Sequence, residues 1–157
     1  MKLTDKFKQH EIEWRIMTGG FKNNDESQPW AIILPYLTSR AIMNRLDDAI
    51  GVENWQDHYR QLEHGITCSL SLRIKNEWIT KEDGASETEI DSFKGGLSDA
   101  FKRAAVKWGM GRYLYELKGP YFAQFKKQNE NFHYKTKITK NSKYFRWSPP
   151  EIPDLYD

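Results

Sequence analysis

Residues 66–75 alternate strictly between apolar and polar side chains, and no other feature of the chain constrains its fold as much. The apolar positions are Ile66, Cys68, Leu70, Leu72 and Ile74. Successive side chains of a β-strand point to opposite faces, so the alternation predicts a strand with one buried and one polar face. Turn-forming pairs flank it at 64–65 and 75–76. We therefore predict an antiparallel meander with further strands at 55–62 and 77–81.

Two predicted helices frame this meander. Residues 36–50 repeat apolar side chains at three- and four-residue steps, with Thr38 or Ser39 as the cap and Gly51 as the end. Residues 94–108 carry a fuller apolar stripe, made of Leu97, Ala100, Phe101, Ala104, Ala105 and Trp108. Paired glycines are expected to open this second helix, and another glycine to close it. The predicted fold class is α+β: a three-stranded antiparallel β-meander packed on a basic α-helix, in the order helix, three strands, helix.

The remaining sequence gives weaker signals. They predict a helix at 3–16, a loop at 18–30, an exposed acidic excursion at 82–91, a short helical stretch at 113–117 and a hairpin that pairs 132–134 with 144–147. We divide the chain into residues 1–120 and a basic, aromatic and proline-rich arm at 121–157, and we assign the arm to the same domain.

Charge is distributed unevenly along the chain. Residues 1–90 hold 11 Lys+Arg against 15 Asp+Glu, a net charge of −4, whereas residues 91–146 hold 13 against 4, a net charge of +9. A basic segment bracketed by acidic ones is typical of a surface that binds a polyanion. A solvated basic face without any partner explains the same numbers, so charge alone leaves both interpretations open.

The chain offers little for catalysis or for membrane insertion. Its 4 histidines lack metal-ligand spacing, no glycine-rich phosphate loop with a lysine is present, and its one cysteine, Cys68, lies on the inward face of its strand. No apolar run approaches the roughly 18 residues of a membrane span, and the N-terminus does not resemble a signal peptide. We expect a soluble, cytoplasmic protein that is not an enzyme and needs no cofactor.

The predicted helix at 94–108 also carries cations. Lys102 and Arg103 are adjacent, so they point about 100° apart around the helix axis. Cations held on a rigid element suit the phosphates of one nucleic-acid strand, or of two.

The run from 95 to 109 resembles the helix that closes the annealing domain of the Rad-fifty-two/Rad-twenty-two recombination proteins, in their bacterial and phage branch. Other matching pieces follow in order: Arg40, Leu46-Asp47-Asp48, Ile50-Gly51, Asn54-Trp55, Ser71-Leu72-Arg73-Ile74-Lys75, Arg112-Tyr113-Leu114-Tyr115 and Trp147-Ser148-Pro149-Pro150. The resemblance covers about residues 30–118 well and the flanks loosely.

This resemblance implies an annealing and oligomerisation domain in residues 1–120. Such proteins form rings, hold single-stranded DNA in a positively charged groove and anneal complementary strands without ATP. The DNA-binding positions that it implies are Lys102, Arg103, Arg40, Arg73, Lys75 and Lys107. Lys107 stands in for a family cation whose position falls on Val106. The expected partners are single-stranded DNA, further copies of the chain, and replication or recombination proteins.

Three other functions stay open at this point. A double-stranded RNA-binding module shares the order helix, three strands, helix and a basic final helix. A Mg²⁺-dependent nuclease would use the carboxylates of Glu87, Glu89 and Asp91 as metal ligands, with Lys94 beside the attacking water. A purely structural oligomerisation domain would leave the cations without a nucleic-acid partner.

Overall fold

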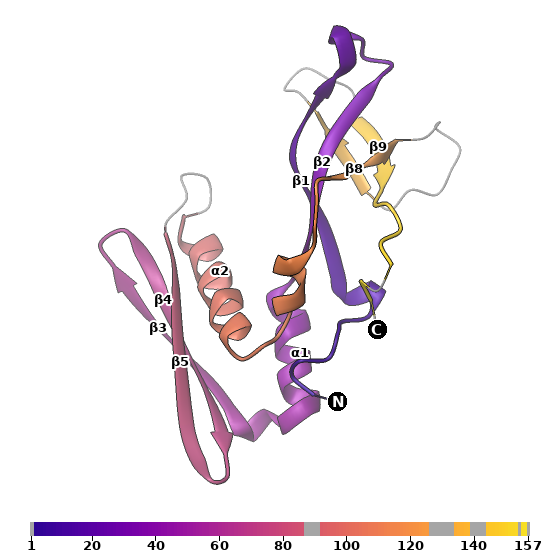
Figure 1. The fold of residues 1–157 in the computed structure, drawn as a ribbon. Coiled ribbons are helices and arrows are strands. Elements are labelled where there is room, and N and C mark those ends of the chain that lie inside the picture. Colours follow the sequence, from indigo (N-terminus) through magenta and orange to yellow (C-terminus); the bar gives the residue numbers. More distant parts are fainter. Residues whose placement is uncertain (1, 87–91, 126–133, 139–143, 154, 157) are drawn as a thin grey trace. The chain divides into compact units, whose positions relative to one another are not determined.

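The computed structural model describes residues 2–86, 92–125, 134–138, 144–153 and 155–156 (Figure 1). Its elements, in chain order, are η1 (Gln9–Glu11), β1 (Ile12–Phe21), η2 (Lys22–Asn24), β2 (Pro29–Leu37), α1 (Ser39–Ile50), η3 (Val52–Asn54), β3 (Trp55–Leu62), β4 (Gly65–Ile74), β5 (Glu77–Ser86), α2 (Ser92–Lys107), η4 (Arg112–Glu116), β6 (Tyr121–Phe122), β7 (Gln124–Phe125), β8 (Tyr134–Lys137) and β9 (Tyr144–Ser148). The fold class is α+β, as predicted.

The chain divides into two compact units. The meander unit comprises Met1–Ile12, Leu37–Glu116 and Tyr156–Asp157, and the second unit comprises Glu13–Tyr36 and Leu117–Leu155. All six predicted DNA-binding residues therefore belong to the meander unit. The predicted division of the chain at residue 120 stays a prediction.

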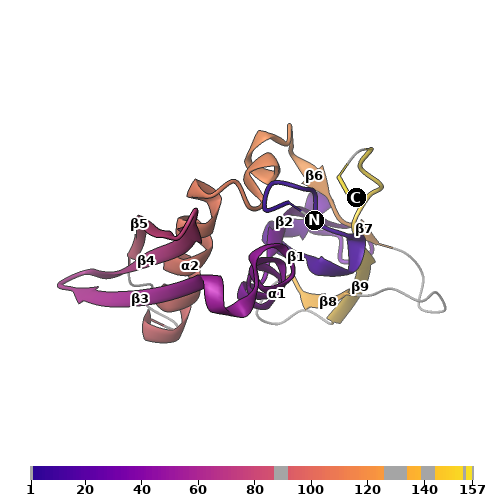
Figure 2. The ribbon, with the colours of Figure 1, turned by 90° about the horizontal axis from the view of Figure 1, so that it is seen from below.

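The meander unit contains a sheet with the strand order β3-β4-β5. Its central strand, β4, pairs antiparallel with both neighbours, so that Leu72 lies opposite Trp55 and Cys68 opposite Asp83. The apolar residues of the predicted alternation are buried from Ile66 to Leu72. Figures 1 and 2 show α2 against one face of this sheet, where it contacts β4 and β5. The predicted strand and its buried face are confirmed.

The third strand, β5, is longer than predicted. It continues beyond residue 81 to Ser86, so an acidic excursion that starts at Glu82 is wrong for the first five of its residues. Carboxylates disfavour strands in general, but Glu82 and Asp83 are held here by neighbouring polar side chains. Residues 87–91 of the predicted excursion lie outside the described residues.

The helix predicted at 36–50 is confirmed as α1, which starts at Ser39. Thr38 caps it, because its Oγ1 accepts a hydrogen bond from the backbone N–H of Ala41 at 3.1 Å. Gly51 ends it with a φ of 91°, a backbone conformation that favours glycine. Ile42 and Leu46 are fully buried on its inner face.

The helix predicted at 94–108 is confirmed as α2, but it begins earlier, at Ser92. The expectation that paired glycines open it is wrong. A Cβ at Gly96 would lie 3.2 Å from the side chain of Ile66, so the missing side chain lets the helix approach β4 closely. Gly109, with a φ of 95°, follows the helix end as predicted. The helical stretch predicted at 113–117 is the 3-10 helix η4.

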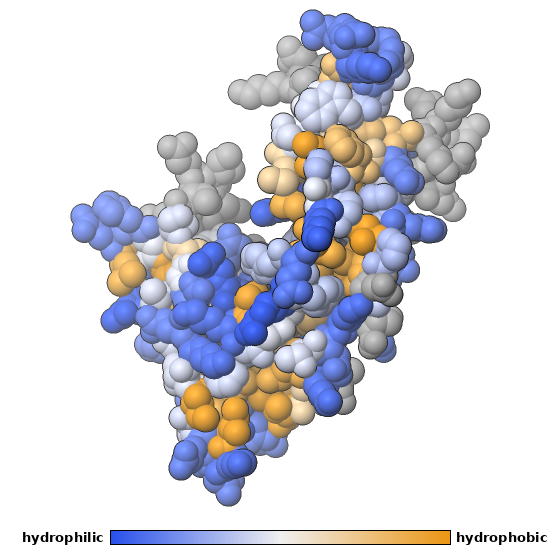
Figure 3. Space-filling model, in the orientation of Figure 1, coloured by the Kyte–Doolittle hydropathy of each residue, from blue (hydrophilic) through white to orange (hydrophobic). Residues whose placement is uncertain are grey.

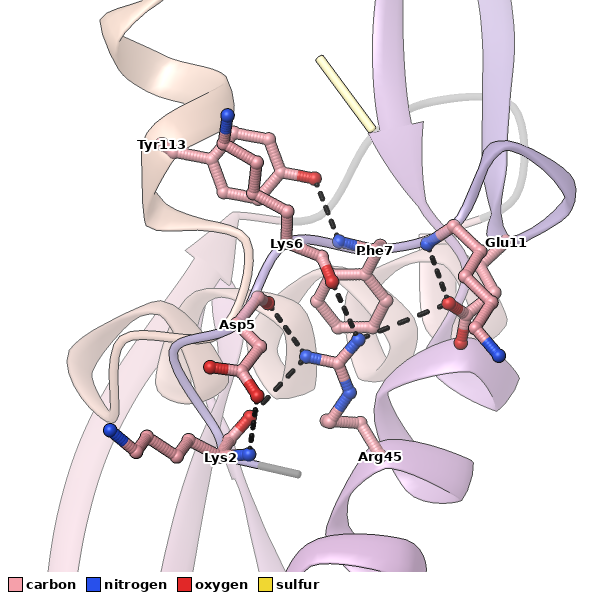
Figure 4. Close-up of polar contacts among 8 residues, drawn as sticks. Lys2, Asp5, Lys6, Phe7, Glu11, Arg45 and Tyr113 are labelled. Atoms are coloured by element: carbon pink, nitrogen blue, oxygen red, sulfur yellow. Dashed lines mark hydrogen bonds and ion pairs between the residues drawn. The ribbon is translucent and has the colours of Figure 1, made fainter. Parts of the chain in front are cut away.

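The N-terminal segment forms a turn and the short 3-10 helix η1 rather than a long α-helix, and it is held by a buried arginine of α1 (Figure 4). Arg45 is 3% exposed and donates hydrogen bonds to the backbone carbonyls of Lys2, Asp5 and Lys6, at 3.4, 2.6 and 3.0 Å. Its guanidinium also lies 3.9 Å from the centre of the Phe7 ring. The helix predicted at 3–16 is therefore wrong, because the carbonyls that a helix would use internally bind Arg45 instead.

The second unit begins with strands where a helix and a loop were predicted. β1, β2 and β6 form a sheet in that order, in which Ile32 lies opposite Phe122 and Ile33 opposite Tyr121. The predicted loop at 18–30 is wrong, because most of it belongs to β1, η2 and the start of β2. Trp14 is buried and meets the Tyr121 ring edge-on, with the ring centres 6.4 Å apart. Tertiary packing of aromatic residues thus overrides the helix-like spacing.

A small sheet with the order β7-β9-β8 completes the second unit. Tyr134 lies opposite Trp147, and their rings stack with centres 4.7 Å apart. This pairing confirms the predicted hairpin for its described residues. Within the described part of the chain, no helix is both long and apolar enough to cross a membrane.

Candidate nucleic-acid interface

α2 carries three of the predicted DNA-binding cations: Lys102, Arg103 and Lys107. Lys102 forms an ion pair with Asp99, one turn earlier on the same helix, at 2.8 Å. Arg103 reaches β5, where its Nε lies 3.2 Å from a carboxylate oxygen of Asp83. The Arg103 side chain is still 53% exposed, so its guanidinium also faces solvent. Both cations are held on a rigid helix and remain accessible to an anion.

The C-terminal end of α2 collects further basic side chains. Lys107 donates to the backbone carbonyl of Glu82, and Lys81 donates back to the Lys107 carbonyl at 2.9 Å. Lys81 also lies 4.4 Å from the Trp108 ring centre. Arg112 donates to the last carbonyls of the helix, where cations complement the negative end of the helix dipole. The sequence did not single out Lys81 or Arg112; strand alternation along all of β5 would have placed Lys81 toward α2.

Arg73 and Lys75 lie at the end of the β4–β5 hairpin. The turn residues Lys75 and Asn76 both have positive φ angles, 50° and 67°, as a two-residue type I′ turn requires. Arg73 is exposed and lies opposite Trp78 in the strand register. Trp78, which the sequence did not single out, is 46% exposed. The sequence could have identified Trp78, because strand alternation places this tryptophan on the polar face of the sheet.

The two arginines of α1 differ in their surroundings. Arg40 lies in the first turn and is exposed, so it can contact a ligand. Arg45 is buried and engaged by backbone carbonyls, as described above, and its longest polar contact is an ion pair with Glu11 at 3.9 Å. The geometry thus leaves Arg40 as the α1 arginine that can contact a ligand.

The structure brings together only part of the predicted set. Arg103 and Lys107 both contact β5, whereas Arg73 and Lys75 lie at the hairpin end and Arg40 on α1. Hydrophilic side chains cover much of the face shown in Figure 3, and apolar ones gather near the lower end of the meander. Exposed apolar residues at this end include Val52, just before β3, and Ile74 and Ile79 beside the turn, where Trp78 is also exposed.

Cys68 is fully buried on the inner face of β4, as predicted. Burial and the nearby Asp57 carboxylate raise the pKa of the Cys68 thiol to about 12. Burial likewise raises the pKa of the neighbouring Tyr59 hydroxyl. A thiol in this state is protonated at neutral pH and is a poor nucleophile.

The carboxylates of the nuclease alternative, Glu87, Glu89 and Asp91, lie outside the described residues. Within the residues that are described, no three His, Cys, Asp or Glu side chains group so as to hold a metal ion.

Comparison with known proteins identifies relatives of the chain. Residues 1–136 match the model of the Rad52/22 family double-strand break repair protein. The single-stranded DNA-binding protein DdrA of Deinococcus radiodurans is 31% identical over 126 residues, which cover 74% of this chain and 58% of that protein. DdrA of Deinococcus deserti is 28% identical over 163 residues, which cover 98% of this chain and 71% of that protein. The chain thus spans little more than half of the first relative's length.

No solved structure is significantly similar to the chain. The family match nevertheless extends over most of the sequence and includes α1, the meander, α2 and the predicted DNA-binding residues. It also confirms the resemblance inferred from the run at 95–109. The chain therefore belongs to the Rad52/22 family of double-strand break repair proteins.

Proposed function

We propose that this protein binds single-stranded DNA and anneals complementary strands without ATP, as a ring of identical subunits and without catalytic chemistry. The observation that carries the proposal is the row of basic side chains on α2, a rigid helix packed on the meander, in a chain of this family. The relatives named as single-stranded DNA-binding proteins support the choice of ligand.

The proposed mechanism begins with phosphate binding. Lys102, Arg103 and Arg40 contact the phosphates, while the bases stay free to pair. Each phosphate displaces a carboxylate that now holds the cation, Asp99 at Lys102 and Asp83 at Arg103. Annealing is then a search between two strands whose mutual repulsion has been neutralised, and no covalent step is required.

The proposed ring needs a contact between subunits, and the exposed apolar end of the meander suits one. Val52 is 69% exposed, and Ile74 and Ile79 are each exposed by about two fifths. Apolar side chains that are grouped on a surface are typical of a protein interface, since burying them is favourable. We expect Val52→Asp to produce smaller particles by light scattering, and the smaller particles to anneal poorly.

The experiment that tests the function is annealing of two complementary labelled oligonucleotides in the absence of ATP. Wild type should accelerate annealing strongly, and Lys102→Ala/Arg103→Ala should lose most of the acceleration. Arg15→Ala/Lys22→Ala is the matched control, because it removes the same charge from exposed positions of the second unit.

Two results would contradict the proposal. A folded wild-type protein that does not accelerate annealing at low salt excludes the annealing function. Stronger binding to duplex RNA than to single-stranded DNA, measured by competition, favours the double-stranded RNA-binding alternative.

A further inference from the structure

The meander has a second face, which we call the outer face, on the side of the sheet away from α2. Apolar residues of β4 point to α2, so Ser69, Ser71 and Arg73 point away from it. The register places Trp78 and Thr80 of β5 on the same side, opposite Arg73 and Ser71. A hydrogen bond of 2.8 Å between Ser71 Oγ and Thr80 Oγ1 agrees with this assignment. The outer face is therefore polar, with one tryptophan near its end.

The guanidinium of Arg73 lies on this face and is not neutralised by a carboxylate of the described residues. It is exposed, and it has no hydrogen-bond or ion-pair partner within the residues that the structure describes. Arg60, on the same face, is different, because its guanidinium lies 3.4 Å from the Glu82 carboxylate. Glu77, the carboxylate nearest to the turn in sequence, lies opposite Ile74 and so points to the other face. Arg73 is thus available to an external anion.

Trp78 lies directly across from Arg73. Opposed side chains of an antiparallel pair have Cβ atoms about 4.5–5.5 Å apart, so the indole and the guanidinium are neighbours. Trp78 is 46% exposed, which leaves ring surface open to solvent. The type I′ turn at Lys75 and Asn76 fixes both strands two residues away, so little conformational freedom is lost on binding.

We propose that Trp78 and Arg73 form a contact for one nucleotide of single-stranded DNA, with the unpaired base stacked on the indole and its phosphate held by the guanidinium. The proposal rests on the proposed function and extends it to a different surface. An aromatic ring beside a cation is the arrangement that binds unpaired bases without sequence preference. The sheet separates this contact from Lys102 and Arg103, so it holds a different segment of DNA from the one on α2.

Cross-linking tests the contact directly. An oligo-dT strand with one 5-iodouracil is irradiated in complex with the full chain, and the cross-linked peptides are identified by mass spectrometry. We expect a cross-link at Trp78 and none at Trp30, an exposed tryptophan of the second unit that is 39% exposed. A cross-link map without Trp78 would overturn the proposal.

Affinity measurements separate stacking from charge. Trp78→Ala should weaken binding of oligo-dT about tenfold, or about 1.4 kcal/mol, whereas Trp78→Phe should stay within about twofold of wild type. Duplex DNA should bind Trp78→Ala as it binds wild type, because paired bases cannot stack on the ring. Arg73→Ala should weaken oligo-dT binding, and Arg60→Ala should do so much less, because Arg60 lies opposite Thr67 and therefore away from Trp78 along the sheet.

The outcomes distinguish this contact from the proposed function. If Lys102→Ala/Arg103→Ala loses binding while Trp78→Ala keeps wild-type affinity, the outer-face contact is wrong and the proposed function stands. If wild type does not bind oligo-dT, both fall. If Trp78→Ala keeps its affinity but forms smaller particles by light scattering, Trp78 belongs to a contact between subunits, and the proposal is overturned.

Discussion

Arg40 and Arg45 lie on the same helix, but their surroundings differ. The Arg40 side chain faces solvent, whereas the Arg45 side chain is buried and donates hydrogen bonds to backbone carbonyls of the N-terminal segment. The difference follows from their neighbours. Arg45 projects beside Leu46 on the inner face of α1, where the N-terminal segment supplies carbonyl oxygens. Arg40, which the family resemblance singled out, is exposed. The role of Arg45 depends on a segment far away in the sequence, so no local pattern reveals it.

Replacing Arg45 should therefore cost stability rather than DNA binding. Arg45→Met leaves three carbonyls of the N-terminal segment without this donor and removes the contacts of a buried side chain, so we expect a loss of about 3 kcal/mol in the free energy of unfolding. Arg40→Met, on the same helix but exposed, should change it by less than about 0.5 kcal/mol. Urea denaturation measures both values. Equal stability of the two variants would show that the contacts of Arg45 contribute little.

Cys68 makes stability depend on alkaline pH. Its thiol pKa is about 12 in the folded protein, above the ordinary value, because burial favours the neutral form. The stabilisation is complete below about pH 9 and is lost as the pH rises toward the folded value, at up to about 1.4 kcal/mol per pH unit. Cys68→Ala lacks this dependence, so its stability relative to wild type should improve from about pH 9 upward in urea titrations. A parallel pH profile for the two proteins would contradict it.

Asp83 competes with DNA for Arg103 under the proposed mechanism. Asp83→Asn keeps an oxygen that accepts a hydrogen bond but removes the charge. Repulsion between a carboxylate and a phosphate about 5 Å apart in water is about 0.8 kcal/mol, so affinity for oligo-dT should rise about fourfold. Glu63→Gln, an 88%-exposed carboxylate at the β3–β4 turn, serves as the control and should change affinity little. Fluorescence anisotropy gives both values, and a weaker Asp83→Asn complex would contradict the competition.

At the scale of elements, the stability of α2 depends on Gly109, which follows its C-terminal end. A Cβ on Gly109 would lie 2.7 Å from Thr4 Cγ2, and the φ of 95° is strained for other residues. Gly109→Ala should thus lower the free energy of unfolding by about 2 kcal/mol. Adding Thr4→Ala removes the steric part and should restore some of the loss. Thermal unfolding of the single and double variants separates strain from collision; equal loss in both would assign it all to strain.

The elements that the sequence predicted well are those in which one pattern is unambiguous. Strict alternation marked β4, and an apolar stripe with a glycine after it marked α2. β1 was missed because Ile12 and Ile16 satisfy helical spacing, while Ile12 and Trp14 also satisfy strand alternation. Local periodicity cannot distinguish a helix from a strand here, and pairing with strands distant in the sequence determines which one forms. The candidate cations came from the family resemblance, whereas their partners Asp83 and Glu82 could be identified only from the fold.

At the scale of the whole molecule, the opposite charges of different segments meet in the folded chain. Acidic residues of the −4 segment, such as Asp83, hold basic residues of the +9 segment, such as Arg103. The net charge of the basic segment therefore overestimates the positive potential available to bound DNA. The salt dependence of binding is a better measure of how many cations contact phosphates. The four proposed phosphate contacts per subunit, at Lys102, Arg103, Arg40 and Arg73, predict a slope of log affinity against log salt of about −2.8 for single strands.

The salt slope tests how many cations bind DNA. Lys102→Ala/Arg103→Ala should reduce the slope to about −1.4, since two contacts of four remain. Titrations of oligo-dT between low and moderate salt provide the values, with Arg15→Ala/Lys22→Ala expected to keep the wild-type slope. An unchanged slope in the α2 variant would place the phosphates elsewhere on the molecule.

The carboxylates beside Lys102 and Arg103 also bear on how long a strand stays bound. Under the proposed mechanism, Asp83 replaces a phosphate that leaves Arg103 from within the same subunit, so dissociation does not wait for an ion to arrive. The residence time of each contact is then short, although many contacts together hold a long strand. A strand that has paired with its complement forms a stiff duplex, which loses these contacts one after another. Under the proposed function, release of the duplex therefore needs no external energy source.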